Sequence, residues 1–535
     1  MKHILKLAMS ILLILIFTAG CDTDELHNLN INPNAVTEID MNFFMTTAIL
    51  GMASAGPLVD NRNTDYTNLG FAGHAIQHFA GTGTSAGDKY FEENISNVWQ
   101  YFYRDSPKYA AEIIKQTGPG GIYEGKQVNT RSAARIIRPF WMHRLTDFYG
   151  NIPYSEAHRG IEGIYQPKYD KQKDIYIDCL KELDEACAAF NASDMDYPNF
   201  AKADFLFHGD VEKWKKFGYS LMLRLAMRVS NVDPGLAANY VTKAVAGGTM
   251  AGNGDNAWAQ MAMGPYNWVN QNGLSRSLWP GDGGLWSSNL FSKTFIDILK
   301  GSDPSSTADD DPRLYIFTQG PIKWSATDLG VILEPDPLKW IGLPVGYDAS
   351  MINNEYGGGN PVTPYEHFCA INTKMLRIDA PYLLMYAAES EFLKAEAILR
   401  NIGTVPGTAQ SHYEAGVRLA MQMYTPLDPS FTVTDARVDT YLSQYPYDEA
   451  NALEQIGTQL WISKFLMWWD SWSDWRRTGY PVLVEVNYPG NATGGKIPRK
   501  FLYPPAEAAG NPNFADGATK PDKMTTRVWW DGGSD

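Results

Sequence analysis

The sequence of 535 residues is short of positive charge. It carries 45 Lys and Arg residues against 60 Asp and Glu residues, a net charge of −15, and contains no run rich in Lys or Arg. Proteins that bind nucleic acid present a basic patch, because the release of counterions from the phosphates supplies much of their affinity. The composition therefore argues against a nucleic-acid partner.

Cysteine is also scarce. Three of the four cysteines, Cys179, Cys187 and Cys369, lie in the body of the chain, and an odd number excludes a complete disulfide framework. Cys179 and Cys187 are about 12 Å apart along a predicted helix, which is too far for a disulfide. No Cys/His spacing suits zinc, and His74 and His78, on one possible helix face, lack a third ligand. We therefore expect small buried thiols, no metal and no cofactor.

Catalytic motifs are lacking as well. The chain has no G-x-S-x-G elbow, no phosphate-binding loop and no H-E-x-x-H motif. A glycosidase needs two carboxylates that flank one bond, and Asp470 and Asp474 lie one helical turn apart. Arg476 and Arg477 follow them, so a surface ion-pair network is the simpler interpretation, and residues 309–311 (three Asp) resemble a helix-terminating turn. The sequence favours a protein that is not an enzyme.

The apolar run at residues 7–17 is shorter than the ~20 residues that span a bilayer. Lys2 and Lys6 precede it and small residues follow it, which is typical of a secretory signal peptide at residues 1–20. The small residues that end in Cys21 resemble the lipobox of bacterial lipoproteins, although Leu is usual where this chain has Thr. The resemblance implies that Cys21 is lipidated and anchors the protein to the outer membrane.

Residues 21–40 are predicted to form a lipidated tether and an extended strap. Asp22, Asp24 and Glu25 crowd behind the cysteine, which fits a solvated tether. The same acidic run resembles the export signal that sends lipoproteins of the Bacteroidetes to the cell surface. Residues 30–34 are too rich in Asn and Pro to be helical.

The rest of the chain, residues 41–535, is predicted to be a single, mainly α domain. Alternating strand patterns are scarce, whereas apolar residues recur at helical spacing in many segments. Helix pairs joined by short turns suggest repeat-like antiparallel packing, although there is no clean 34-residue period. The predicted helices are residues 41–52, 98–115, 132–148, 174–190, 211–229, 382–401, 411–424 and 450–477.

Two stretches are predicted to be loops. Residues 251–288 and 319–364 are packed with Gly, Pro, Asn and aromatic residues. Loops longer than ~15 residues are uncommon in compact domains and are often functional. We therefore expect a binding site in these two stretches.

Several segments, in sequence order, resemble the SusD/RagB family, the surface nutrient-binding lipoproteins of the Bacteroidetes, and its SusD-like branch in particular. ARIIRPFWMHRLTDFYGNIPYSEA at 134–157 is similar to a family helix that ends in D-x-Y-G-x-I-P-Y-x-E-A. WKKFGYSLMLRLAMR within 210–234 is similar to the helix W-x-K-F-x-x-S-L-x-x-R-L-A-x-R. The further matches are DPRL at 311–314, GLPVG at 342–346, APYLLMYAAESEFLKAEA at 380–397 and IPRKFLYPPAEAAGNPN at 497–513.

The resemblance implies tetratricopeptide-like helix pairs as a scaffold, with irregular loops that carry the ligand site. It also implies capture of oligosaccharides, or sometimes peptides, for a SusC-like TonB-dependent transporter. A structural surface lipoprotein that binds no nutrient would share the leader, the helices and the acidity, so the sequence leaves that alternative open.

Sugars present apolar C–H faces, which stack on aromatic rings, and hydroxyls, which bond to polar side chains. Indole and phenol rings also carry a polar group, which suits a half-wet surface. The alternative is that these rings are buried in a core that supports the loops. The predicted ligand-binding residues are Tyr266, Trp268, Asn270, Arg276, Trp279 and Trp286 in the first loop, with Trp324, Trp340 and Tyr347 in the second.

A second set of tryptophans has a different spacing. These residues are three, four or seven apart on a predicted helix, which favours core or partner-helix packing over ligand contact. They are Trp461, Trp468, Trp469, Trp472 and Trp475.

Overall fold

The structure is a computed structural model. Beyond Met1, it describes residues 39–53, 68–83, 86–92, 96–104, 106–265, 269–278, 289–323 and 331–534. The predicted signal peptide, Cys21 and most of the strap lie outside the described residues. Among the helices of the described part, none has the length and apolar character needed to cross a bilayer.

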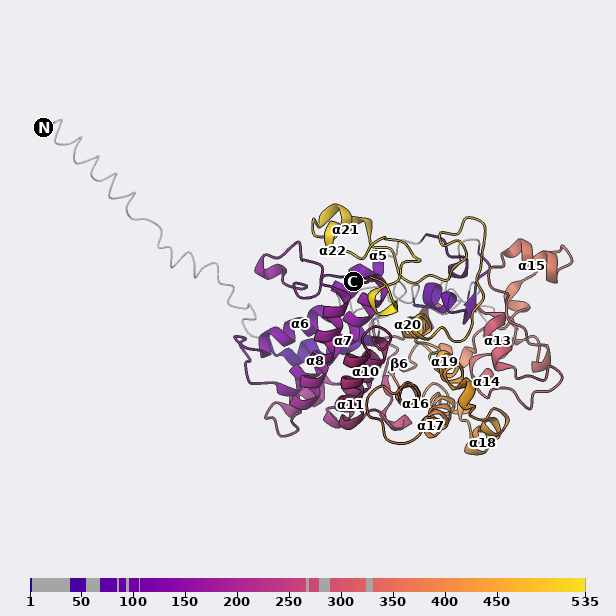
Figure 1. The fold of residues 1–535 in the computed structure, drawn as a ribbon, viewed down its shortest axis with the longest axis horizontal. Coiled ribbons are helices and arrows are strands. Elements are labelled where there is room, and N and C mark those ends of the chain that lie inside the picture. The colour runs from indigo at the N-terminus through magenta and orange to yellow at the C-terminus, as the bar shows by residue number, and fades with distance from the viewer. Residues whose placement is uncertain are drawn as a thin grey trace.

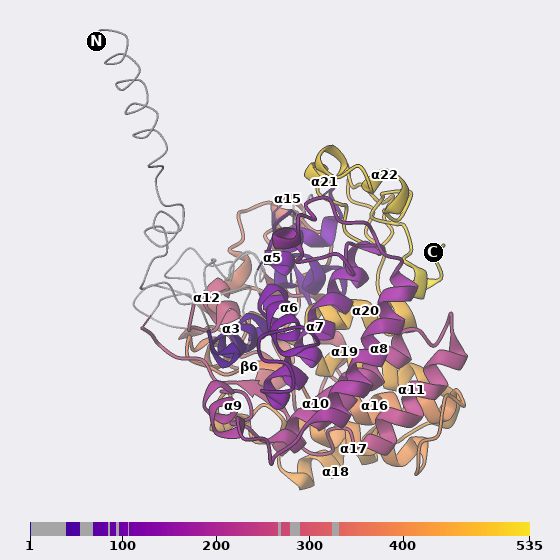
Figure 2. The same ribbon diagram turned by 90° about the vertical axis from the view of Figure 1, so that its left-hand side faces the viewer.

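The first half of the chain forms a set of helices in which neighbours along the sequence pack side by side (Figure 1, Figure 2). α3 packs on α6, α6 on α7, α7 on α8, α8 on α10 and α10 on α11. The bounds are α3 (Met41–Ala53), α5 (Ser96–Arg104), α6 (Ser106–Thr117), α7 (Val128–Tyr149), α8 (Gln172–Ala189), α9 (Tyr197–Ala203), α10 (Val211–Arg228) and α11 (Pro234–Gly247).

A second group of helices comes from the last third of the chain. α16 packs on α17, α19 and also on α10, so it joins the two groups. This arrangement confirms the prediction of a mainly α, tetratricopeptide-like scaffold. The bounds are α16 (Ala387–Leu399), α17 (Ala409–Gln422), α18 (Asp435–Gln444), α19 (Ala452–Ser463) and α20 (Trp468–Thr478).

Shorter elements connect and cover these helices. The short helices are α12 (Gly273–Leu278), α13 (Lys293–Leu299), α14 (Leu314–Phe317), α15 (Ala349–Tyr356), α21 (Pro505–Gly510) and α22 (Phe514–Gly517). The strands form antiparallel pairs, β1 (Phe79–Ala80) with β3 (Leu290–Phe291), β2 (Ala257–Ala259) with β6 (Tyr382–Met385), and β4 (Ile322–Lys323) with β5 (Val331–Ile332).

Local sequence signals explain several helix ends. The Asp210 side chain caps α10, because its Oδ1 accepts hydrogen bonds from the amides of Glu212 and Lys213 at 3.1 and 3.0 Å. Gly150 ends α7 with a φ of 87°, and a Cβ there would lie 2.1 Å from the Thr519 hydroxyl oxygen. The turn after α7 therefore requires glycine.

Three predicted helices have different boundaries. Residues 98–115 belong to two helices, α5 and α6, and residues 382–401 begin with the strand β6 before α16 starts. Residues 450–477 are divided between α19 and α20, which are separated by a turn in which Leu466 has a φ of 81°. A non-glycine residue in this conformation leaves no sequence signal, so periodicity alone joined the two helices.

The two predicted loops contain regular structure. β2 and α12 lie within residues 251–288, and α15 lies within residues 319–364, so the prediction that both stretches are loops without helices is wrong. The Asp348 side chain caps the start of α15, because it accepts a hydrogen bond from the Met351 amide at 3.0 Å.

The three cysteines of the body of the chain are all buried and unpaired, as predicted. Cys179 and Cys187 lie on α8, and Cys369 lies between α15 and β6. Burial raises the pKa of the Cys179 and Cys369 thiols to about 12.

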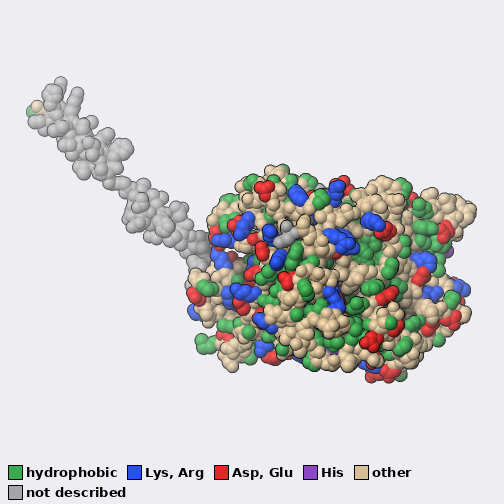
Figure 3. Space-filling view, in the orientation of Figure 1, with side chains coloured by type: hydrophobic (Ala, Val, Ile, Leu, Met, Phe, Trp, Pro, Cys, Tyr) green, Lys and Arg blue, Asp and Glu red, His purple; other side chains and the backbone are tan. Residues whose placement is uncertain are grey.

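Positive and negative side chains are mixed on the surface. On the face drawn in Figure 3, Lys and Arg side chains are interspersed with Asp and Glu. This face offers no broad basic area to a phosphate backbone.

Candidate functional site

The first predicted loop, residues 251–288, rests on a fixed base. β2 pairs with β6, so the start of the loop is held by the strand that leads into α16. Asn272 fixes the middle: its amide donates to the Ile378 carbonyl at 2.7 Å and its Nδ2 to the Ala380 carbonyl at 3.0 Å. Gln271 Nε2 donates to the Met263 carbonyl at 2.7 Å. The described parts of the loop are therefore held in place by backbone contacts.

The predicted ligand-binding residues of this loop fall into two groups. Asn270 and Arg276 lie on either side of Asn272 and are both half-buried. The Asn270 carbonyl accepts a hydrogen bond from the Ala262 amide at 2.7 Å, and Arg276 lies on α12. The aromatic candidates Tyr266, Trp268, Trp279 and Trp286, and Trp324 in the second loop, lie outside the described residues.

The remaining candidates of the second loop make intramolecular contacts. Trp340 is 6% exposed, and its indole Nε1 donates to the Glu334 carbonyl at 2.9 Å. A Cβ at Gly320 would lie 2.4 Å from Trp340 Nε1, so the indole packs directly on this backbone. Tyr347 is half-buried and donates its hydroxyl to Glu355 Oε2 at 2.6 Å. In this structure Trp340 supports the loop rather than presenting a face to solvent.

The tryptophans of α19 and α20 pack in the core, as predicted. Trp461 donates to the Ile76 carbonyl at 2.9 Å, Trp472 to the Pro498 carbonyl at 2.9 Å and Trp475 to the Pro481 carbonyl at 3.2 Å. Because these three indoles are both buried and hydrogen-bonded, they tie distant loops to the helices.

The two carboxylates of α20 lie inside the protein, so the prediction of a surface ion-pair network is wrong. Asp470 is 3% exposed. It accepts hydrogen bonds from Arg144 Nη2 at 2.6 Å and Nε at 3.3 Å, and lies 3.4 Å from Arg224 Nη1. The partners come from α7 and α10, which cover the face of α20 that a short sequence window would assign to solvent.

Asp474 extends the same network. Arg228 Nη2 donates to Asp474 Oδ1 at 3.0 Å, and Arg228 Nη1 to Asp147 Oδ2 at 2.7 Å. Lys464 Nζ lies 2.5 Å from Asp474 Oδ2 and donates to Glu389 Oε1 at 2.7 Å. Each buried carboxylate therefore faces at least one buried cation.

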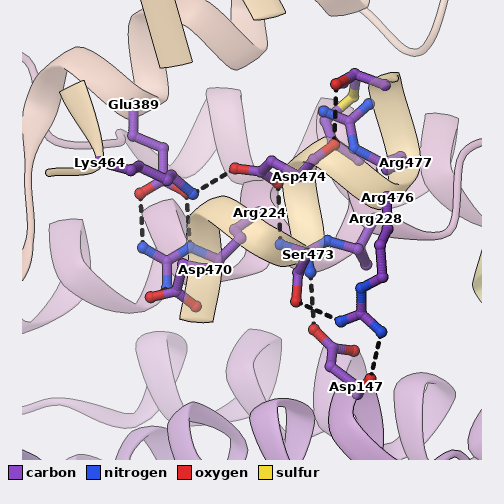
Figure 4. Close-up of polar contacts among 12 residues, drawn as sticks. Asp147, Arg224, Arg228, Glu389, Lys464, Asp470, Ser473, Asp474, Arg476 and Arg477 are labelled. Atoms are coloured by element: carbon purple, nitrogen blue, oxygen red, sulfur yellow. Dashed lines mark hydrogen bonds and ion pairs between the residues drawn. The ribbon is translucent and has the colours of Figure 1, made fainter. Parts of the chain in front are cut away.

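Arg224 closes the arrangement with a bidentate pair to Glu389, at 2.7 and 2.6 Å (Figure 4). This set of residues links α7, α10, α16 and α20, and we call it the ionic network. Its members are Arg144, Asp147, Arg224, Arg228, Glu389, Lys464, Asp470 and Asp474.

The network keeps its carboxylates ionised. Burial alone would raise the pKa of Asp470, but the guanidinium groups of Arg144 and Arg224 outweigh burial and hold that pKa well below its ordinary value. Burial likewise opposes ionisation of Asp474, yet Lys464 and Arg228 lower its pKa to about 2. A glycosidase acid needs a raised pKa and access to the substrate. Neither Asp470 nor Asp474 meets these requirements, so the arrangement is structural.

Arg476 lies at the edge of the network between two indole rings. Its guanidinium carbon is 3.9 Å from the Trp472 ring centre and 4.7 Å from that of Trp530. It donates to the carbonyls of Asp147 and Arg499 at 2.7 and 2.5 Å. Burial lowers the pKa of this guanidinium to about 9. Arg476 therefore joins the C-terminal segment to the helices.

Arg224, Arg228 and Glu389 were missed by the sequence analysis. The signal that could have found them is in α10, where two arginines stand four residues apart inside the apolar run LMLRLAMR. Arginine is seldom buried unless it is paired, so a core-facing pair of arginines indicates buried acids on a neighbouring helix.

His74 and His78 do not form a metal site. Both imidazoles are buried, and the Trp468 indole donates to His78 Nδ1 at 3.1 Å. Burial lowers the pKa of His74 to about 4 and that of His78 well below its ordinary value. Within the described ranges, no group of three or more His, Cys, Asp or Glu side chains is placed to hold a metal ion.

Comparison with known families gives one match over most of the chain. A SusD-like family model, described as starch-binding and associating with the outer membrane, matches residues 33–504. A comparison with curated protein sequences gave no match.

Solved structures match over nearly the whole chain. One, named a chitin-binding protein, is 28% identical with a TM-score of 0.76, and the match covers 92% of this chain and 100% of the other. A SusD-like protein named after Bacteroidetes AC2a is 24% identical with a TM-score of 0.76, covering 92% and 100%. A SusD homologue from Bacteroides uniformis is 24% identical with a TM-score of 0.71, covering 92% and 99%. The last two likenesses show the fold alone.

Proposed function

Because the chain belongs to the SusD-like family, we propose that it is a lipoprotein that captures oligosaccharides at the outer membrane. The match over residues 33–504 carries this proposal. The helical scaffold supports it, because it holds long segments rich in aromatic residues on a rigid base. Binding residues commonly lie on loops that a rigid scaffold positions.

The ligand that we propose is a neutral glycan. The family description names starch, and the solved structure that is 28% identical is named for chitin binding. Oligomers of glucose and of N-acetylglucosamine are therefore the two ligands to test first. The mixed charge of the face in Figure 3 is compatible with an uncharged ligand.

We place the primary site on the loop at residues 251–288. Tyr266, Trp268, Trp279 and Trp286 are the proposed stacking residues, and Asn270 and Arg276 the proposed polar partners. The support for this location is the anchoring of the loop by β2 and Asn272. Trp324 of the second loop is proposed to extend the site.

Binding is proposed to occur without turnover, with delivery of the ligand to a SusC-like TonB-dependent transporter. Asp470 and Asp474, the carboxylate pair considered for glycoside hydrolysis, are buried and engaged by cations. Lipidation at Cys21 would hold the protein at the membrane beside such a transporter. The Cys21→Ala variant should then leave the membrane fraction or accumulate as a precursor.

Binding is tested with maltoheptaose and chitohexaose on the full-length, detergent-solubilised protein. One of the two should raise the melting temperature in a concentration-dependent manner, because a ligand that binds only the folded state stabilises it by mass action. No new reducing ends should form. A protein that is stabilised by neither sugar, or that cleaves either one after repurification, would contradict the proposed function.

The location of the site is tested with two matched tryptophan variants. Trp268→Ala should weaken binding several-fold with little change in melting temperature, because a lost stacking contact amounts to about 1 kcal/mol. Trp340→Ala should instead lower stability by about 3–5 kcal/mol, because the indole is buried. Equal affinity of Trp268→Ala and the unchanged protein, repeated for Trp279→Ala and Trp286→Ala, would exclude this loop.

A further inference from the structure

An aromatic cleft lies where the end of α5, residues 153–167 and α21 meet. α5 lies beside α21 (Figure 1), and a hydrogen bond from Trp99 to Glu507 joins the two helices. The volume of the cleft is about 490 Å³, within the range of small-molecule sites. We call it the α5–α21 cleft. No residue of the loop at 251–288 lines it within the described ranges.

The floor of the cleft consists of two aromatic rings whose polar atoms are already bonded. Trp99 Nε1 donates to Glu507 Oε1 at 3.1 Å, and the Tyr103 hydroxyl donates to the Pro153 carbonyl at 2.6 Å. The two ring centres are 5.1 Å apart, with the planes inclined by 62°. Because their donors are engaged, these rings offer mainly carbon surface to a ligand.

The walls are held in place by hydrogen bonds between segments. His158 has a φ of 63°, an uncommon conformation for a non-glycine residue, and its Nε2 donates to the Tyr103 carbonyl at 2.7 Å. On the opposite side, Asn511 Nδ2 donates to the Pro167 carbonyl at 2.8 Å. The cleft is therefore formed before any ligand arrives, which reduces the entropic cost of binding.

The rim of the cleft carries side chains that have no hydrogen-bond partner among the described residues. Tyr165 is 82% exposed, and among the described residues its hydroxyl makes no hydrogen bond and its ring no aromatic contact. Gln100 on α5 is exposed, and its amide likewise has no hydrogen-bond partner in the described part of the chain. An exposed phenol can stack on the C–H face of a sugar, and an exposed amide in the same cleft can bond to its hydroxyls.

The cleft is close to electrically neutral. Arg104 and Glu507 are the two charged side chains that line it, and they are opposite in sign. Burial lowers the pKa of His158 to about 4, so this imidazole is uncharged at neutral pH. An uncharged ligand therefore avoids the cost of desolvating an unpaired charge.

We propose that the α5–α21 cleft is a second oligosaccharide site, in which a sugar ring stacks on Tyr165 and its hydroxyls bond to Gln100 and Arg104. The ligand class rests on the proposed function, whereas the location rests on the geometry of the cleft alone. Two sites on one chain would let a long glycan be held at two points, which increases retention without new contacts at the primary site.

The test combines variants of the two sites on the full-length protein. Equilibrium dialysis with maltoheptaose and with chitohexaose should give two bound molecules per chain for one of the sugars. Tyr165→Ala should weaken one of the two sites about fivefold or more, whereas Trp268→Ala should weaken the other. Met195→Ala, which removes a 96% exposed apolar side chain between α8 and α9, is the control and should change neither.

Each outcome separates the two proposals. One bound molecule per chain, with Tyr165→Ala and Gln100→Ala both binding like the unchanged protein, overturns the second site and leaves the proposed function intact. If only one molecule binds per chain, and binding is lost in Tyr165→Ala but not in Trp268→Ala, the cleft is supported as the binding site. The proposed location of the primary site on the loop at residues 251–288 is then overturned. If neither sugar binds, and a neutral peptide such as (Gly-Ala)₃ binds in a way that depends on Tyr165, the assignment of both sites to sugars is overturned.

Discussion

The ionic network and the α5–α21 cleft are built from similar side chains in opposite circumstances. Around the network, arginine, carboxylate and aromatic groups are buried and each carboxylate has a charged partner. In the cleft, an exposed tyrosine and an exposed amide stand over a floor whose polar atoms are already bonded. The difference shows that residue type does not separate structure from function in this protein. The two regions differ in whether the protein itself supplies the hydrogen-bond and ion-pair partners of these side chains.

The strongest test of this comparison removes one charge from the network. Asp470→Ala should lower the free energy of unfolding by about 3–5 kcal/mol, because it leaves Arg144 buried without its carboxylate and leaves Arg224 with Glu389 alone. Denaturant unfolding measures the change. The control is Asp435→Ala, which breaks the exposed pair with Arg418 and should cost less than about 1 kcal/mol. Equal effects of the two variants would contradict a special role for the buried network.

Acid should weaken the network in a defined pH window. The pKa of Asp474 is about 2 in the folded protein and close to its ordinary value of 3.8 when unfolded. Its contribution of about 2 kcal/mol is therefore complete above the unfolded value and is lost as the pH falls through about 2. The difference in unfolding free energy between the unchanged protein and Asp474→Asn should narrow between pH 5 and pH 2. A difference that stays constant would assign the acid sensitivity to other groups.

Two Tyr→Phe variants compare the contribution to stability of a buried tyrosine hydroxyl at the ionic network with that of an exposed one at the cleft. The Tyr176 hydroxyl is buried and donates to Asp147 Oδ1 at 2.5 Å, so Tyr176→Phe should cost about 1–2 kcal/mol of stability. Tyr165→Phe should be neutral, since its hydroxyl is exposed. Thermal melting of both variants measures this difference in stability. Equal losses of melting temperature would contradict the prediction.

The smallest expected effect on stability is that of Tyr165→Ala. Removal of a ring that is 82% exposed should change the unfolding free energy by less than about 0.5 kcal/mol. A larger loss would mean that the ring supports the fold of the cleft.

The helical class and the tryptophan core could be predicted because they depend on spacing within one segment. Trp468 and Trp472 lie one turn apart on α20, and the structure buries both. The ionic network could not be predicted in this way, because Arg144 and Asp470 are 326 positions apart in the sequence. A local window sees the charged residues of α20 without the arginines that cover them.

The same limit applies to the sites. Glycine and aromatic content directed attention to residues 251–288, and the structure adds the anchoring of that loop by Asn272. The α5–α21 cleft had no local signal, since Gln100, Tyr165 and Glu507 come from three separate segments. Burial of Trp340 was also invisible, because it depends on the close approach of Gly320.

The three buried cysteines can serve as reporters of local unfolding. Cys179 and Cys187 lie in the first group of helices and Cys369 lies outside it, so each thiol becomes reactive only when its own surroundings loosen. Pulsed maleimide labelling followed by peptide mapping would therefore show, in intact cells, which part of the molecule unfolds locally first under heat or mechanical load.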